Sequence, residues 1–426
     1  MSGSTGASLR RELGLLDAVS VGLGAIIGAG IFVLIGIAAG LAGPAVVLAV
    51  LISGVSATFT ALSFCELGSA LPRAGGVYEY GHTLIHPLVG FLMGWIWVSG
   101  NIVLGATASQ GFAFYLSFFA PGLSYRVVAA VLVLIVTLVN VLGAKLSARV
   151  NDVFVAVKVL VLVLLVAFGL PLVRAENFSP FMPKGFPPVL EAAALFYFAY
   201  IGFPRISTMA EEVKRPERNI PLAILLALGI SAVLYALVSL AAVGVAGWVR
   251  LASSSAPLAE VAEIVGLGWV VGVGGLVATF SVVLTSVMGQ SRVFFAMARN
   301  GEMPGRLSEV SRRLGTPVYS VMLSGVVMLC LVLTMDISGL AMLTSFLVLL
   351  THVLTNLADL RLCLRAELNP PFKAPLRPLH AVVGMLLSLA LTFSVEQRAI
   401  VLGVAVMVAG ITWFYSYKAL TSPRKA

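Results

Sequence analysis

The chain has 426 residues, of which 60% are hydrophobic and only 11% are charged, with a formal net charge of +9. Soluble globular domains are about one quarter charged, so this composition excludes an ordinary soluble domain. The basic residues do not alternate with aromatic ones, as an RNA-binding surface requires, and no nucleic-acid partner is expected. The composition instead indicates an all-α integral membrane protein that is surrounded by the lipid bilayer.

Long uncharged runs divide the chain into membrane-spanning segments. A helix needs about 20 apolar residues to cross the hydrocarbon core. The uncharged runs are 18–65, 80–125, 127–144, 159–173, 192–204, 219–249, 264–291, 314–335, 337–358, 378–395 and 399–417. The first run is longer than one crossing and is split at Gly43-Pro44, whereas the second has a loop near His86-Pro87 before a long helix up to Pro121. Together the runs predict about 12 transmembrane helices.

Basic residues are distributed unevenly between the two ends of these helices. If the N-terminus is cytoplasmic and the helices alternate, the inner loops and termini hold 20 basic residues and the outer loops hold 5. The positive-inside rule therefore predicts that both termini are cytoplasmic, in a multi-pass protein of the cell membrane. Residues 1–12 are polar and basic, but the apolar segment that follows is too long for a signal-peptide core, so we expect it to be retained.

A glycine-rich string interrupts the first span about halfway along. Gly28-Ala29-Gly30 lies within GLGAIIGAGIF, residues 22–32. Glycine permits unwinding, and unwinding here would leave amide groups at the start of a half-helix, where the helix dipole favours a carboxylate. The alternative is helix packing through small residues, which is common in membranes. The glycine spacing does not match the nucleotide-binding pattern GxGxxG, and no strand precedes it.

Two polar residues stand out in the third and fifth spans. Asn101 is the most polar group near the middle of the third span, where it could bond a substrate or a neighbouring helix. Lys158 lies in the apolar string NDVFVAVKVLVLVLL, 7 residues past Asn151, which is about 10 Å along a helix. Loss of water disfavours the charged form of a lysine, so Lys158 is a candidate for reversible protonation. The alternative is that its long side chain snorkels to the inner surface.

A second interruption follows about 170 residues after the first, in FAYIGFP, residues 198–204. Aromatic residues crowd around Ile201-Gly202, and Pro204 removes a backbone donor and helps to end the preceding half-helix. The aromatic rings could cover a bound side chain, or they could surround a simple proline kink. Two broken spans at corresponding places in two halves of a membrane protein are the best sequence indication of a transporter's substrate site.

Hydroxyl side chains occur along the eighth span. Ser281, Thr285 and Ser286 could hold an ion or accept a bond from a lysine ammonium, although such hydroxyls more often bond their own helix. The three cysteines and four histidines form no spacing pattern of metal ligands or disulfides, so we expect no metal and no cofactor. The apolar runs also lack the convergent acidic, histidine and cysteine groups that a membrane-embedded enzyme needs.

The spans are organised as two groups of five. Residues 1–426 are predicted to form a single transmembrane domain, in which segments 1 and 6 each open a group and each carry a break. An odd number of spans per group inverts the second group relative to the first. The groups cover residues 14–174 and 188–361, and two further helices follow at 378–419.

Several of these strings resemble signatures of the amino acid–polyamine–organocation superfamily of transporters, most closely its bacterial and archaeal branch related to cationic amino acid transporters. GLGAIIGAGIF resembles the first-helix signature, GAKLSARVNDVFVAVK the fourth-to-fifth, FAYIGFPRISTMAEEVKRPERNIPLAI the sixth, GQSRVFFAMARNGEMP the eighth, and PPFKAPLRP the connector before helix 11. The matches run from residue 14 to 378 in the expected order. The resemblance implies two inverted five-helix repeats with broken helices 1 and 6, followed by two extra C-terminal helices.

The resemblance also implies roles for particular residues. Substrate-binding groups would be the backbone of the first break, which receives the carboxylate, and the backbone of the second, which receives the α-amino group; these residues are Ile27, Gly28, Ala29, Gly30, Phe198, Ile201 and Gly202, with Asn101 nearby. Phe198 falls at the gating aromatic position. Lys158 falls where proton-coupled relatives carry a lysine in place of a sodium ion, and Ser281, Thr285 and Ser286 lie on the helix that faces it.

Two departures from the family pattern bear on the substrate. Relatives often have an acidic residue directly after GF in helix 6, where this chain has Pro204 and Arg205. Relatives that accept cationic amino acids commonly carry GWDLILEY in helix 3, where this chain has GWIWVSGN, with Ile96 and Gly100 at the acidic positions. A cationic side chain would be buried there without a partner, so we expect neutral amino acids.

The expected function is therefore proton-coupled uptake of neutral amino acids by alternating access, with an amino acid, protons and the bilayer as partners. An exchanger or a proton-independent facilitator of the same fold, and uptake of cationic amino acids, remain alternatives. A channel is a distant one, because no repeated filter or charged ring is visible. The sequence leaves the oligomeric state open.

Overall fold

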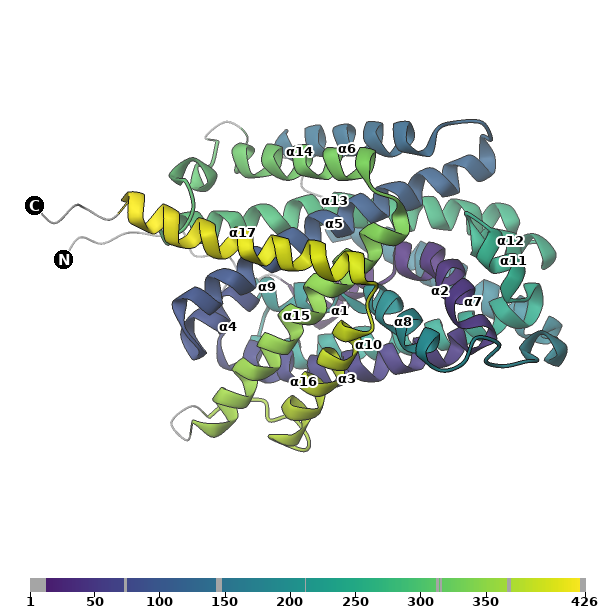
Figure 1. The fold of residues 1–426 in the computed structure, drawn as a ribbon, viewed down its shortest axis with the longest axis horizontal. Coiled ribbons are helices and arrows are strands. Elements are labelled where there is room, and N and C mark those ends of the chain that lie inside the picture. The colour runs from purple at the N-terminus through teal and green to yellow at the C-terminus, as the bar shows by residue number, and fades with distance from the viewer. Residues whose placement is uncertain are drawn as a thin grey trace, which may run out of the picture.

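The computed structural model describes residues 13–72, 75–142, 148–210, 212–311, 314, 316–365 and 369–421. Within these ranges the chain is helical, and β pairing is limited to one parallel bridge between Leu13 and Val213. The long helices lie side by side along the horizontal direction of Figure 1. The prediction of an all-α membrane fold is confirmed.

The first half of the chain supplies five spans. They are α1–η1–α2 (Leu15–Ile26, Gly30–Leu34, Ile35–Ala42), α3 (Val46–Ala70), α5 (Pro87–Phe119), α6 (Tyr125–Val141) and α7 (Ala148–Gly169). The predicted split at Gly43-Pro44 is confirmed, because a short 3-10 turn, η2 (Gly43–Ala45), separates α2 from α3. The predicted loop at His86 is also present, but a short helix that we did not expect, α4 (Val77–Leu84), precedes it.

The second half supplies the remaining spans. They are α8–η5–α9 (Pro187–Phe196, Tyr197–Tyr200, Pro204–Thr208), α10 (Pro216–Ala246), α13 (Gly268–Arg299), α14 (Val318–Thr334), α15 (Ile337–Leu364), α16 (Leu379–Phe393) and α17 (Gln397–Thr421). Short helices in the loops, which the sequence patterns did not predict, are η3 (Leu170–Leu172), η4 (Ala175–Phe178), α11 (Trp248–Ser253), α12 (Pro257–Ile264) and η6 (Gly305–Ser308).

The number of spans agrees with the prediction of about 12. Among the described residues, 8 helical stretches are long and apolar enough to cross a membrane, and one of them, Leu15–Ala70, contains two predicted spans. Three shorter apolar helices, α6, α14 and α16, supply the others. These helices have 17, 17 and 15 residues, slightly fewer than the about 20 that cross the hydrocarbon core.

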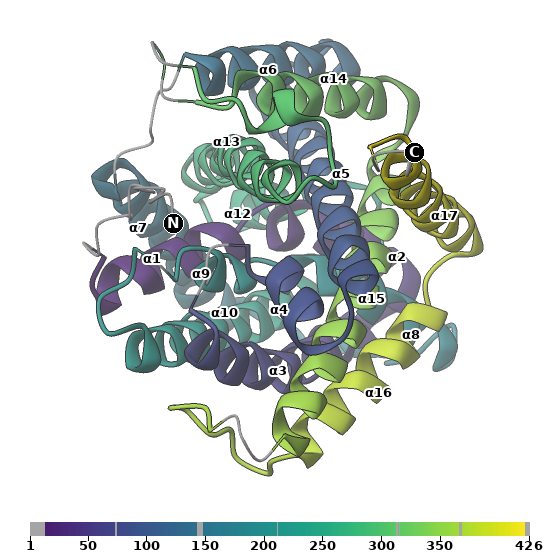
Figure 2. The same cartoon turned by 90° about the vertical axis from the view of Figure 1, so that its left-hand side faces the viewer.

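The broken segments lie at the centre of the molecule. In Figure 2, α13 lies above α1 and α9, and α3 and α10 lie below them. On the right, α4 and α5 lie between them and α15, whereas α6, α14 and α17 lie at the periphery. The most apolar window of α8–η5–α9 is 83% buried, and that of α17 is only 22% buried. Exposed apolar side chains on the peripheral helices, such as Leu134, Val326 and Val408, suit contact with lipid.

Several helices end on the same side of the molecule. Both α15 and α17 end toward the left of Figure 1, and the connector between α15 and α16 reaches the end of α3, where the amide of Phe372 donates to Ser69 Oγ at 3.2 Å. This side is called the carboxyl-terminal side below. The proline-rich connector, residues 369–378, contains no helix, as its sequence predicts.

Candidate substrate and coupling site

The first span, α1–η1–α2, is called helix 1 below, and it is broken where its glycines predict. The first half, α1, ends at Ile26, Ile27 has extended backbone (φ −77°, ψ 106°), and helical structure resumes at Gly30 as a single π turn. Within the described part of the chain, neither Gly28 nor Ala29 donates its amide to a backbone carbonyl. Free amides at the start of a half-helix are a suitable environment for a carboxylate.

The sixth span, α8–η5–α9, is called helix 6 below; it is also broken, and its break is longer. The first half-helix, α8, ends at Phe196, continues as the 3-10 turn η5, and passes through a turn at residues 201–203 before α9 begins at Pro204. Phe198 and Ile201 are buried. The amide of Ile201 donates to the carbonyl of Phe198 over a long distance, 3.4 Å.

The two breaks pack directly against each other. A Cβ atom added to Gly30 would lie within 3.0 Å of the backbone of Ala199, and one added to Gly202 would lie within 3.0 Å of the backbone of Ala25. Only glycine permits such an approach between main chains. The tertiary structure therefore brings the predicted substrate-binding segments together, although binding itself remains a prediction.

Two buried side chains cover the carbonyl groups that the break in helix 1 exposes. The Lys158 ammonium donates to Gly24 O at 2.9 Å and to Ile27 O at 2.8 Å. The Tyr235 hydroxyl on α10 lies 2.9 Å from Ile26 O. Buried carbonyls without a donor are costly in hydrocarbon, so these contacts are what allow the helix to remain unwound.

Lys158 does not snorkel to the surface in this structure, because its side chain is fully buried. It belongs to a row of polar contacts that joins α7 to α1. Nearer the start of α7, Asn151 Nδ2 donates to Ser20 Oγ at 3.2 Å, and the Ser20 hydroxyl donates to the Asp152 carboxylate. The first half of helix 1 is therefore held by α7 at three points along its length.

The predicted hydroxyl groups of α13 bond elsewhere in this conformation. Ser281 and Ser286 donate to carbonyls of their own helix. Thr285 also bonds its own helix and accepts a hydrogen bond of 2.6 Å from Arg205 Nη1 on α9. Arg205 acts electrostatically on Lys158, so the cation next to the lysine comes from helix 6. The part that the three hydroxyl groups play in proton coupling remains a prediction.

Asn101 lies in the middle of α5 and is 5% exposed. Its Nδ2 donates to Trp97 O, one turn earlier in the same helix, at 2.8 Å. Its role toward a substrate remains a prediction.

A buried polar cluster that our sequence analysis missed lies on the carboxyl-terminal side. A carboxylate oxygen of Glu66 on α3, a carboxylate oxygen of Asp359 on α15 and the sulfur of Cys363 on α15 lie within 4.8 Å of one another. His380 on α16 contacts Asp359, and Arg377 contacts Glu66. A weak signal was present, since Glu66 and Asp359 directly follow the uncharged runs 18–65 and 337–358. Spacing along the chain could not show that they meet.

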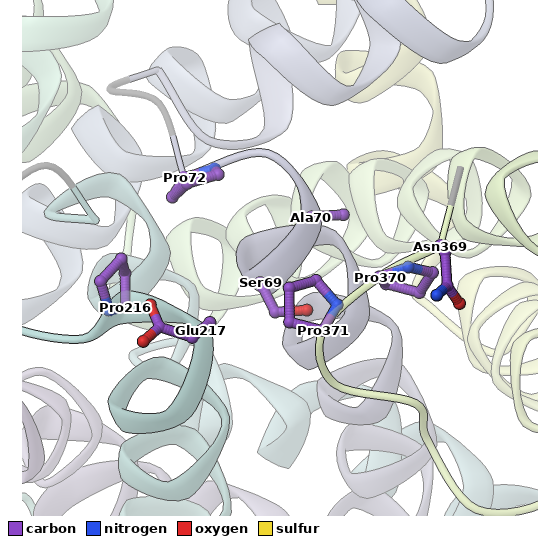
Figure 3. Close-up of a pocket in the computed structure, with 8 residues that line it drawn as sticks. All are labelled: Ser69, Ala70, Pro72, Pro216, Glu217, Asn369, Pro370 and Pro371. Carbon is purple, nitrogen blue, oxygen red and sulfur yellow. The ribbon is translucent and has the colours of Figure 1, made fainter. Parts of the chain in front are cut away.

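A surface hollow of about 470 Å³ lies near this cluster. Figure 3 shows its lining residues, with Pro371 of the connector beside Ser69 at the end of α3 and Glu217 on the facing helix α10. A second hollow, of about 480 Å³, is lined by residues that include Glu176 and Trp248. Neither hollow is lined by residues of the two breaks, so neither is the candidate substrate site.

An all-helical membrane protein in which two interrupted helices meet at the centre has the construction of a secondary transporter. Residues 13–416 match the family described as amino acid permease. The chain belongs to this family, within the amino acid–polyamine–organocation superfamily, and is a transporter rather than an enzyme.

Several curated relatives are similar over most of the chain. The branched-chain amino acid permease BcaP of Bacillus subtilis is 32% identical over 96% of this chain and 93% of its own length. The methylthioribose transporter of the same species is 31% identical over 89% of this chain and 87% of its own length. The vacuolar cationic amino acid transporter 4 of Arabidopsis thaliana is 32% identical over 79% of this chain and 60% of its own length.

Proposed function

We propose that this protein carries neutral amino acids across the cell membrane together with protons, by alternating access. The observation that carries the proposal is the fully buried Lys158 ammonium, which binds two carbonyl oxygens at the break of helix 1. Carbonyl oxygens at an unwound membrane helix commonly coordinate a coupling cation. In this chain the Lys158 ammonium occupies that position, and its amino group can gain or lose a proton.

The proton on Lys158 would control how firmly α1 is held. With the proton bound, the ammonium makes two charge-assisted hydrogen bonds to α1, which are stronger than neutral ones. When the proton leaves, the neutral amine binds the same carbonyls more weakly, and the repulsion from Arg205 disappears. The first half of helix 1 can then separate from α7, which is the movement that alternating access requires.

The substrate carboxylate would sit at the amides of Gly28 and Ala29. The nearby charges of Lys158 and Arg205 favour an anionic group there. The α-amino group would be received by carbonyls of the second break, near Phe198 and Ile201, and Phe198 would close over the bound molecule. Cargo of this kind is zwitterionic, with its two charged ends bound by different helices.

The residues at the positions that are acidic in cation-accepting relatives support a neutral side chain. Ile96, at one of the positions where cation-accepting relatives carry an acid, is fully buried, and Gly100 faces the apolar residues Leu347 and Val348. Arg205 adds a cation on helix 6 and would repel a lysine or arginine substrate. The branched-chain substrate named for the relative BcaP is of the neutral class.

We also propose the arrangement of the protein in the membrane. Residues 14–174 and 188–361 would form the two inverted repeats that rock around the breaks, and 378–419 would add helices outside them. The carboxyl-terminal side, with both chain termini, would face the cytoplasm, as the 20-to-5 distribution of basic residues indicates.

Uptake by proteoliposomes tests the function. The full chain would be reconstituted and supplied with labelled alanine, leucine, glutamate and arginine, with and without an inward proton gradient. We expect leucine or alanine to accumulate above equilibrium only with the gradient. Saturable arginine uptake with both neutral amino acids ignored contradicts the substrate class. Uptake that is stimulated by internal substrate and indifferent to the gradient identifies an exchanger instead.

A further inference from the structure

The buried cluster on the carboxyl-terminal side contains two carboxylates and one permanent cation. Glu66 and Asp359 are fully buried, and so is His380. Arg377, whose side chain is 23% exposed, contacts Glu66 Oε2 through Nε at 3.3 Å. A buried charge needs a partner, so the ionisation of each carboxylate depends on which donors surround it.

Glu66 has the donors that an ionised carboxylate requires. Its Oε1 accepts from the amide of Ala374 at 2.6 Å, and its Oε2 accepts from the Cys363 thiol at 3.4 Å and contacts Arg377. Arg377 Nε also lies 3.2 Å from Cys363 Sγ. The guanidinium therefore occupies the position between these groups, and a metal ion is not needed to balance Glu66.

Asp359 has no comparable set of donors. His380 Nε2 lies 2.8 Å from Asp359 Oδ2, but within the described ranges Asp359 Oδ1 and His380 Nδ1 have no hydrogen-bond partner. A charged imidazolium would bury an unpaired N–H at Nδ1. The neutral ring, with Nε2 donating to Oδ2, avoids that cost. Among the described residues Asp359 then has no cation in contact with it, because the nearby Arg377 contacts Glu66 instead.

Ser63 is a hydrogen-bonding neighbour that a protonated Asp359 could use. The Ser63 hydroxyl adjoins the Asp359 carboxylate, yet it gives its single proton to Asn356 Oδ1, at 2.8 Å. An ionised Asp359 would compete for that proton, whereas a protonated Asp359 would donate to the free lone pairs of Ser63.

We propose that Asp359 is a second proton-binding residue of this transporter, distinct from Lys158, and that its proton is gained and lost during the transport cycle, an inference that rests on the proposed proton-coupled function. The charged and titratable groups facing it come from four elements. They are Cys65 and Glu66 on α3, Cys363 on α15, Arg377 on the connector and His380 on α16.

A chain of buried polar groups links this residue to the break of helix 6. Beyond Ser63, Asn356 Nδ2 donates to Thr60 Oγ1 at 3.0 Å. The Thr60 hydroxyl adjoins the hydroxyl of Tyr197, in the 3-10 turn of the break, and Tyr197 is 2.7 Å from His352 Nδ1. Protonation of Asp359 can therefore reorient donors as far as the segment that is expected to bind substrate.

Water can approach the cluster through the hollow under the connector. Ser69, which lines that hollow (Figure 3), donates to the carbonyl of Glu66 at 2.9 Å. Solvent thus reaches within one helical turn of Glu66. A proton delivered there would bind Asp359 Oδ1 and form an O–H group that donates to Ser63 Oγ.

Infrared difference spectroscopy of the purified full chain between acid and neutral pH tests the proton site directly. We expect a protonated-carboxyl band that is lost in Asp359→Asn. The band should be kept in Asp336→Asn, which removes an exposed carboxylate from the other end of the same helix, and in His380→Gln, which keeps a donor to Oδ2. A band that persists in Asp359→Asn overturns the assignment.

Transport measurements test whether the proton is used. Asparagine mimics the protonated acid, so we expect Asp359→Asn to keep uptake at acid pH and to lose part of the pH dependence seen in the wild type and in Asp336→Asn. An unchanged pH profile, with the band lost, overturns the role in the cycle. Wild-type uptake that does not respond to the gradient refutes the proposed coupling instead. The infrared spectra then still decide whether Asp359 binds a proton.

Discussion

Replacing Lys158 by methionine removes both bonds to the break of helix 1 while keeping a side chain of similar length. A hydrogen bond to a charged group contributes about 1.5–3 kcal/mol, so two of them contribute about 3–6 kcal/mol to holding α1 on α7. The variant leaves Gly24 O and Ile27 O without this donor, but it also avoids the several kcal/mol that burial of an ammonium costs, and the two effects offset each other. We therefore expect overall stability to change little, although the contact between the two helices is lost.

The loss acts on the conformational equilibrium rather than on folding. At about 1.4 kcal/mol per factor of ten, even 3 kcal/mol shifts the balance between held and released α1 by about two orders of magnitude. Initial uptake rates in proteoliposomes, measured with and without a proton gradient, report on coupling, and amide hydrogen exchange of α1 reports on its release. We expect gradient-driven accumulation to vanish and exchange in α1 to rise.

The matched control is Lys184→Met. Lys184 also donates to a carbonyl of helix 1, Gly40 O, but it is exposed and lies at the opposite end of that helix. This variant should keep gradient-driven uptake. If Lys158→Met accumulates substrate against a gradient as well as the wild type does, a proton on Lys158 is not what couples transport.

Three further predictions concern the same site. Gly30→Ala places a methyl group against the backbone of Ala199, which costs about 1–3 kcal/mol; uptake should be lost, whereas Gly229→Ala on α10, with open space around it, should transport normally. Tyr235→Phe removes the donor to the free carbonyls and should lower the free energy of unfolding in detergent by about 1–3 kcal/mol; an unchanged melting temperature would contradict this. Arg205→Gln removes a cation beside the site, so arginine should become a better competitor of leucine uptake, and equal inhibition constants in variant and wild type would show that Arg205 does not select against cations.

The sequence by itself determined the kind of protein and where its helices break. Uncharged runs long enough to cross hydrocarbon require helices, and Gly28, Gly30 and Pro204 mark the places where local backbone chemistry permits or favours an interruption. Lys158 was identified for the same reason, because a lysine within an apolar run is exceptional in any fold. These features depend on residues close together in the chain.

Only the tertiary structure decided which residues contact each other across the chain. Tyr235 covers a carbonyl 209 residues away, and Glu66 accepts from an amide 308 residues away. Asp359 is the one acidic residue within α15, and nothing near it in the sequence shows that α3 and α16 enclose it. The partners of a buried polar group depend on which helices pack together. That packing is driven by the burial of apolar surface, and this driving force has no preferred direction that the local sequence could encode. Local sequence therefore marks the breaks, but it cannot name the side chains that stabilise them.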